Sequence, residues 1–168
     1  MAEGDPAAPY TDATRARLAV AFAAYEVADL ARAAVPIGEA ELSPDGTARS
    51  AGSTLADAAH VLGAAWRLFE AAAVFERVAG ADWQLVGDTL GVSAGAARDR
   101  FAVAEVCFRE GSNGPRGEAS WWRDHLAQHP LEAARDLDDW VLRHEDGDSG
   151  LGTTPVSGGL VRRMKAGE

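Results

Sequence analysis

Residues 82–101 constrain the fold more than any other part of this chain, because glycine and serine separate two helical patterns at one point. Val86 and Leu90 lie four residues apart and would share one side of a helix. Gly91 follows at a position where a left-handed backbone ends many helices. Ser93 is a favourable N-cap for a second helix. The segment therefore predicts a short helix, a tight turn and another helix.

Small residues in this segment predict that its two helices pack closely. Gly87 falls where the helices would cross, and Ala97 and Phe101 would form the buried side of the second helix. Asp82 can cap the first helix, whose start Trp83 would anchor. DNA-binding helix-turn-helix units are built in this way: the first helix braces the second, and the second enters the major groove.

A family resemblance rests on the same residues. The run WQLVGDTLGVS, which ends at Ser93, resembles the W-Q-x-[IV]-G-x-x-L-G-V-S run of small helix-turn-helix regulators from high-GC actinobacteria. The run SAGAARDRF, which ends at Phe101, is similar to the recognition helix of sigma-factor region 4 and related response regulators. The resemblance covers residues 70–108 and implies a DNA-binding transcriptional regulator. It departs from the first group at Ala94 and Gly95, where an Arg-Gln pair often follows the serine.

The predicted partner is double-stranded DNA, read by the second helix in the major groove. Arg98 lies near the side opposite the buried one and has the reach and donors to pair with a guanine edge. Arg100 or Arg109 could contact phosphate. The candidate DNA-binding residues are Ser93, Ala94, Gly95, Arg98, Arg100 and Arg109.

Net charge supports an alternative function. The chain has 16 Lys and Arg against 26 Asp and Glu, a formal net charge of -10. Phosphate contacts depend on basic side chains, so this balance predicts weak non-specific DNA binding. The alternative is a non-catalytic protein-interaction module, whose acidic surface contacts a basic protein partner and whose helix-turn-helix no longer reads DNA.

Apolar spacing elsewhere predicts an all-α helical bundle with a central helix-turn-helix and disordered termini. Further helices are expected over 11–34, 54–78, 118–128 and 131–144. The expected organisation is a disordered start (1–10), a long-helix packing or dimerisation region (11–79), the helix-turn-helix (80–110), a C-terminal helical pair (118–145) and a disordered, Gly-rich tail (146–168).

A heptad-like stripe marks the second long helix. Leu55, Ala59, Leu62, Trp66, Phe69 and Ala73 follow one another at alternating spacings of four and three. Two interpretations remain open: the stripe is core between neighbouring helices, or it is the interface of a homodimer. The candidate interface residues are Leu55, Leu62, Trp66 and Phe69.

The remaining candidate residues predict neither a metal site nor a catalytic site. His125 and His129 share a helix face, but no cysteine pair or further histidine supports a zinc site, so we expect no metal and no cofactor. No nucleophile, base and orienting group can be assembled, so we expect no enzyme. Trp121 and Trp122 are interpreted as helix-packing residues, and Asp136, Asp138 and Asp139 as a solvated face.

Localisation is predicted to be cytoplasmic. Cys107 is the sole cysteine, which excludes an intrachain disulfide and favours a reducing compartment; we interpret it as a buried small hydrophobic residue. The first residues lack the basic and apolar regions of a signal peptide, and no apolar run approaches membrane-spanning length.

Overall fold

The computed structural model describes residues 10–111, 120–147 and 149–163, and within these ranges every regular element is a helix. The predicted all-α fold class is confirmed, and the helix ends lie within two residues of the predicted ranges. In chain order the helices are α1 (Asp12–Ala33), α2 (Ser53–Val78), α3 (Trp83–Leu90), α4 (Ala94–Arg109), α5 (Ser120–Gln128), α6 (Pro130–His144) and the 3-10 helix η1 (Ser157–Gly159).

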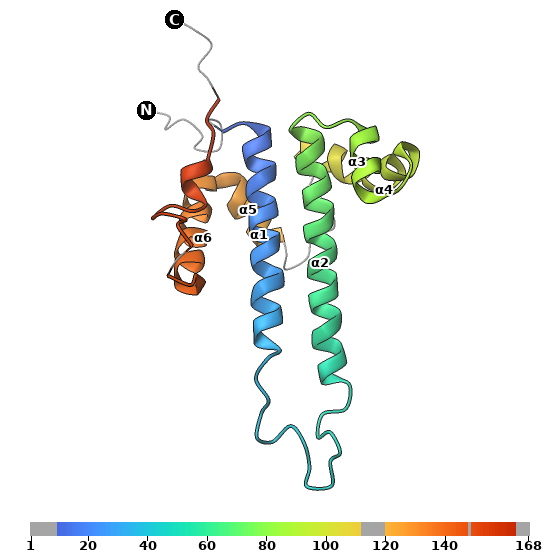
Figure 1. The fold of residues 1–168 in the computed structure, drawn as a ribbon, viewed down its shortest axis with the longest axis vertical. Helices are drawn as coiled ribbons and strands as arrows, with labels where there is room; N and C mark the ends of the chain where they lie inside the picture. Colours follow the sequence, from blue (N-terminus) through green and yellow to red (C-terminus); the bar gives the residue numbers. More distant parts are fainter. Residues whose placement is uncertain (1–9, 112–119, 148, 164–168) are drawn as a thin grey trace, which may run out of the picture.

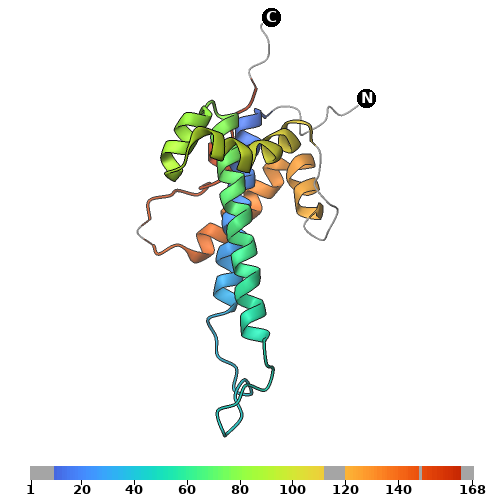
Figure 2. The same ribbon diagram turned by 90° about the vertical axis from the view of Figure 1, so that its right-hand side faces the viewer.

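The helices α1 and α2 form a long antiparallel pair at the centre of the molecule (Figure 1). Helices α5 and α6 lie on the side of α1, and α3 and α4 lie on the side of α2. The loop 34–52 extends beyond the far end of the pair (Figures 1 and 2). The α3–α4 unit therefore contacts the rest of the molecule mainly through α2.

One side of α2 is covered by α1. Ala64, midway along α2, is fully buried. On the same side, Nε of Arg67 donates a hydrogen bond to Oε2 of Glu26 on α1 at 3.4 Å. Residues three apart share a helix face, so these two residues mark the side of α2 that α1 occupies.

The main core cluster lies between α1 and α6. Leu18 and Phe22 of α1 pack with Ala134 and Leu137 of α6, and partly buried apolar residues surround them. Tyr25 extends this contact, because its ring meets Trp140 of α6 edge-on at 5.4 Å between centroids. Pro130 occupies the first turn of α6, as its position in the sequence predicted.

The C-terminal segment differs from the expected disordered tail over 146–168. Val156 packs against the α1–α6 core, as does Leu160. Val161 pairs with Thr14: the Thr14 hydroxyl donates to the Val161 carbonyl oxygen at 2.9 Å. The Gly-rich composition concealed these few apolar anchors. Tyr10, the last residue of the expected disordered start, is also ordered: it is buried and pairs with Arg162 in a β-bridge. Residues 1–9 and 164–168, also expected to be disordered, lie outside the described ranges.

Asp138 holds this segment in place. Its Oδ1 accepts hydrogen bonds from the backbone N–H groups of Val156 at 2.6 Å and Ser157 at 3.0 Å. The Ser157 hydroxyl donates to the other carboxylate oxygen. The side chain is only 4% exposed, so the prediction of a solvated face is wrong at Asp138, although Asp136 and Asp139 are exposed. The partner of Asp138 lies 18 residues away in sequence, where local spacing gives no indication of it.

Candidate functional site

The candidate site is the α3–α4 corner, which comprises α3, the turn at Gly91–Ser93 and α4. Oδ1 of Asp82 accepts a hydrogen bond from the Leu85 N–H at 2.8 Å and caps α3. Gly91 ends α3 in the left-handed conformation, with φ 67° and ψ 31°. Oγ of Ser93 accepts from the Ala96 N–H at 3.1 Å and caps α4. The two caps and the turn predicted from the sequence are confirmed.

Gly87 permits the sharp angle of the corner. A Cβ at this position would lie 2.7 Å from the Val92 carbonyl oxygen and 3.0 Å from the Ala94 nitrogen. A side chain would therefore meet the backbone of the turn and of the first residue of α4. The close approach expected at Gly87, where the two helices were predicted to cross, is to the turn and to the first residue of α4.

Helix α4 has a buried side and an exposed side. Ala97, Phe101 and Glu105 are buried at successive spacings of four. The Phe101 ring meets Phe69 of α2 edge-on, with 5.3 Å between centroids. Gly95, Arg98 and Asp99 are exposed at the start of α4, and Ala94 is half-buried. The first turns of α4 thus present their outer side to solvent.

The three candidate arginines of α4 have different surroundings. The Arg100 guanidinium lies over the Trp66 ring of α2, 4.4 Å from its centroid. Arg109 donates from Nη2 to Oε1 of Glu105 at 2.9 Å. Arg98 is exposed, and within the described residues no hydrogen bond or ion pair engages it. Among the described residues, Arg100 and Arg109 therefore contact other side chains of the protein, whereas Arg98 has no such contact.

Glu105 is the buried charge that joins the corner to α2. Its Oε2 accepts from Nε of Arg77 on α2 at 3.0 Å, while Oε1 accepts from Arg109. Burial by itself would raise the pKa of the Glu105 carboxyl, but the hydrogen bonds and positive charges of Arg109 and Arg77 outweigh burial and hold that pKa below its ordinary value. Arg77 also lies over the Trp83 ring at 4.3 Å, which fixes the start of α3.

Sequence reasoning missed Glu105 and Arg77. A signal for Glu105 was present, since it follows Ala97 and Phe101 at spacings of four and so falls on the buried side of α4. A carboxylate on a buried side requires a cationic partner. Its partner Arg77 lies 28 residues earlier, and no local pattern connects the two.

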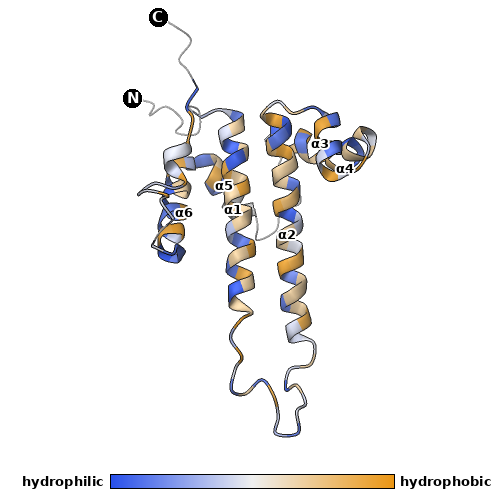
Figure 3. Cartoon of the chain, in the orientation of Figure 1, coloured by the Kyte–Doolittle hydropathy of each residue, from blue (hydrophilic) through white to orange (hydrophobic). Residues whose placement is uncertain are grey.

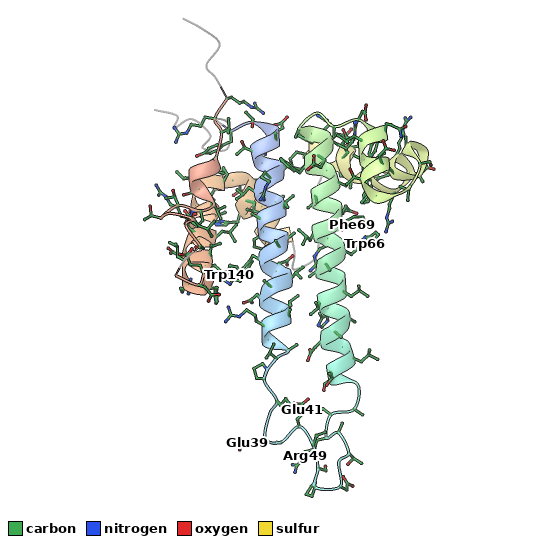
Figure 4. The ribbon with its side chains drawn as sticks, in the orientation of Figure 1. Glu39, Glu41, Arg49, Trp66, Phe69 and Trp140 are labelled. Atoms are coloured by element: carbon green, nitrogen blue, oxygen red, sulfur yellow. The ribbon has the colours of Figure 1, made fainter. Side chains whose placement is uncertain are left out.

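The stripe on α2 divides into a covered part and an open part. Phe69 packs against Phe101 of α4, and Ala73 is buried. Figure 4 shows Trp66 and Phe69 extending from α2 on the side of the corner. Leu55 is 75% exposed, Leu62 71% and Trp66 46%. Colouring by hydropathy shows apolar residues along both parts of α2 (Figure 3). In a single chain the stripe is therefore core only at its C-terminal end.

The other sequence candidates form no site within the described residues. The rings of His125 and His129 lie 5.6 Å apart, but across the described parts of the chain no three His, Cys, Asp or Glu residues group as metal ligands would. Cys107 is a half-buried free thiol. The side chains of Trp121 and Trp122 lie outside the described residues, so the packing predicted for them stays a prediction.

Helix α2 is long and apolar enough, by length and composition, to cross a membrane, and only 17% of its most apolar window is buried inside the described structure. This differs from the expectation that no apolar run approaches that length. A core helix passes the same test but is mostly buried, and one such helix is by itself weak evidence for a membrane segment.

Comparison with protein-family models, curated proteins and solved structures gives no match to this chain.

Proposed function

We propose that this protein is a cytoplasmic DNA-binding transcriptional regulator whose α3–α4 corner acts as a helix-turn-helix, with α4 entering the major groove of double-stranded DNA. The observation that carries the proposal is the combination of a left-handed Gly91, a capping Ser93 and an exposed first turn of α4. A reading helix must be held rigidly by its brace and left uncovered at its N-terminal residues. The corner meets both requirements.

Arg98 is the proposed base-reading residue. It is exposed on the outer side of α4, and within the described residues no partner holds it. A guanidinium donates two parallel hydrogen bonds to O6 and N7 of guanine, a contact worth about 1–3 kcal/mol of discrimination. Gly95, three residues earlier and also exposed, leaves the helix surface low, so that the backbone can approach the groove.

The engagement of Arg100 and Arg109 predicts an unusual salt response. Stacking on Trp66 and pairing with Glu105 keep these two cations from phosphate. Residues 82–110 contain no Lys or Arg besides Arg98, Arg100 and Arg109, so few basic side chains of the corner remain to release counterions. The slope of affinity against salt should therefore be shallow, since it scales with the number of phosphates neutralised.

A second candidate function is supported by the contacts that Arg100 and Arg109 make with Trp66 and Glu105. The corner then presents one available cation, Arg98, together with exposed acids such as Asp88 on α3 and Asp99 on α4, and a surface of this kind is suited to a basic protein. In that case the corner is a non-catalytic interaction module that no longer reads DNA. The two candidates differ in one measurable property, which is binding to duplex DNA at low salt.

The deciding experiment selects duplexes from a random pool with the purified full chain, then measures binding by Arg98→Ala. We expect the variant to lose roughly tenfold or more in affinity for the selected duplex, equivalent to one base contact. Its melting temperature should stay unchanged, because the side chain is exposed. Arg17→Ala, which removes an exposed arginine from α1, is the matched control and should bind like the parent.

Two results would overturn the DNA-binding proposal. One is that no duplex is retained by the parent chain at low salt. The other is that Arg98→Ala binds the selected duplex as tightly as the parent does. Either result moves the protein-interaction function ahead.

A further inference from the structure

We propose that the open part of the α2 stripe, from Leu55 to Trp66, is a docking surface for the same surface of a second copy of this chain, with the two α2 helices antiparallel. We call this surface the α2 seam. The inference stands independently of DNA binding, because it rests on α2 alone and its test is the oligomeric state.

The α2 seam has the spacing of a coiled coil, and within the described residues only its last member, Trp66, has a partner from another helix, the Arg100 guanidinium. Leu55, Ala59, Leu62 and Trp66 occupy the alternating core positions of two heptads. Leu55 and Leu62 are among the most exposed large apolar residues of the protein. Ala64, on the opposite side, is buried against α1. The seam therefore faces away from α1, the described helix that covers α2 at Ala64.

The absence of charged residues beside the seam indicates that its partner is an apolar helix surface without charges. The residues flanking the seam on either side are Ala56, Ala58, Gly63 and Ala65. Two chains that each carry a net charge of -10 repel one another over most surfaces. From Leu55 to Leu62 the seam and its flanks carry no charged residue, and Arg100 lies only over Trp66 at its end. Two copies therefore meet there without like charges facing each other, whereas a charged partner would leave its ions unpaired. A second α2 seam is apolar, uncharged and of matching period, so it fits all three requirements.

The position of α4 determines the direction of pairing. Helix α4 covers the continuation of the stripe at Phe69, and Arg100 reaches back over Trp66. In a parallel pair both α4 helices would lie at the same level and compete for space. In an antiparallel pair with Leu55 opposite Trp66 of the second copy, Phe69, on which α4 packs, lies one residue beyond the first residue of the other α2, and the Arg100 side chain lies in the layer of Leu55.

Size complementarity supports this register. The same alignment places Ala59 opposite Leu62 of the second copy, so a small side chain meets a large one in each central layer. The seam spans twelve residues, or about 18 Å at the rise of an α-helix. Because this length is short, the monomer and dimer should be in a concentration-dependent equilibrium rather than form an obligate pair.

The first test measures sedimentation of the full chain over a range of micromolar concentrations. The parent should shift from monomer to dimer as concentration rises, and Leu62→Glu should remain monomeric while circular dichroism shows its helicity kept. Leu55→Glu should act in the same way, because it also places a charge in the seam. The matched control is Leu85→Glu, which makes the same change at an exposed leucine of α3 and should dimerise like the parent.

A second test examines direction with single cysteines in a Cys107→Ala background. A mixture of Leu55→Cys and Trp66→Cys should form a mixed disulfide under mild oxidation, because the register places these positions opposite each other. Leu55→Cys alone should not cross-link, since antiparallel copies separate the two sulfurs by about 16 Å along the helix axis. Self-linking of Leu55→Cys without the mixed product would overturn the antiparallel arrangement.

Other occupants give distinct outcomes that contradict the proposal. A parent chain that stays monomeric at every concentration overturns it, as does a Leu62→Glu variant that dimerises like the parent. Binding of the parent to neutral lipid vesicles, lost in Leu62→Glu and without any dimer in solution, would assign the seam to a membrane surface instead. These outcomes do not depend on DNA binding, so a protein that fails to bind DNA would still test the proposed dimer.

Discussion

The Cα of Gly87 faces the carbonyl oxygen of Val92 so closely that an added Cβ would lie 2.7 Å from that oxygen. The neighbouring atoms are backbone atoms of the turn, which cannot rotate away as the end of a side chain can. The angle between α3 and α4 is therefore tied to the absence of a side chain at one position in α3.

Gly87→Ala should destabilise the protein although alanine is the better helix former. Helix propensity favours alanine by about 1 kcal/mol, but overpacking against fixed backbone costs about 1–3 kcal/mol. We expect a net loss in the free energy of unfolding, measured in urea. Gly95→Ala is the control, because its Cβ would have only the Ser93 hydroxyl oxygen nearby, at 3.8 Å. That variant should be as stable as the parent or more so, and equal behaviour of the two variants would contradict the contact.

Gly91 can be tested separately from Gly87, because open space surrounds it and its constraint is the positive φ of 67°. Gly91→Val should lower the free energy of unfolding by roughly 1 kcal/mol or more, since a β-branched residue is strained in the left-handed region. Gly91→Asn should cost less, because asparagine adopts this conformation more readily. A valine variant as stable as the asparagine variant would show that the turn does not depend on this backbone conformation.

The corner could be predicted from sequence because its determinants act within a few residues. The Asp82 and Ser93 caps each bond to an N–H three residues later, and Gly91 acts on its own backbone. These are local stereochemical effects, which a single sequence displays directly. The same locality explains why the helix ends were predicted closely.

The rest of the site depends on contacts between distant residues. Arg100 was a candidate for phosphate contact because the sequence does not show that Trp66, on another helix, lies beneath it. The division of the α2 stripe at Trp66 likewise depends on where α4 packs. Periodicity identified an apolar face correctly, but tertiary packing decides which part of that face stays open.

Acid should weaken the connection between α4 and α2 through Glu105. The folded-state pKa of this carboxyl is held below its ordinary value of 4.5, so the unfolded chain takes up the proton first as pH falls. Its contribution to stability is complete above about pH 5 and is lost as pH falls through 4.5 and then through the lower folded-state pKa. Denaturant unfolding of the parent and of Glu105→Gln across this range measures the contribution as a difference.

At neutral pH, Glu105→Gln should cost about 1–3 kcal/mol, because it removes hydrogen bonds between charged groups and keeps the shape of the side chain. The difference between parent and variant should shrink toward pH 3. Glu110→Gln, an exposed neighbour on the same segment, is the control and should change stability little at any pH. A pH-independent difference for Glu105→Gln would show that packing, and not charge, supports this contact.

Asp138 should decide whether the C-terminal segment stays on the α1–α6 core. Its carboxylate receives two backbone N–H groups and one hydroxyl from Val156 and Ser157, which are charge-assisted bonds. Asp138→Ala leaves those donors without their acceptor and removes the link between α6 and η1. We expect faster amide hydrogen exchange and faster protease cleavage within residues 149–163, together with a loss of about 1–3 kcal/mol in the free energy of unfolding.

The neighbouring aspartate provides the comparison for this change. Asp136 lies two residues earlier on α6, but its side chain is exposed, so Asp136→Ala should leave exchange in the C-terminal segment as it is in the parent. Helices α3 and α4 should show parent-like exchange in both variants, because α6 contacts them only weakly or not at all. If Asp138→Ala left residues 149–163 as protected as before, the anchoring would have to come from Val156, Leu160 and the Thr14–Val161 hydrogen bonds alone.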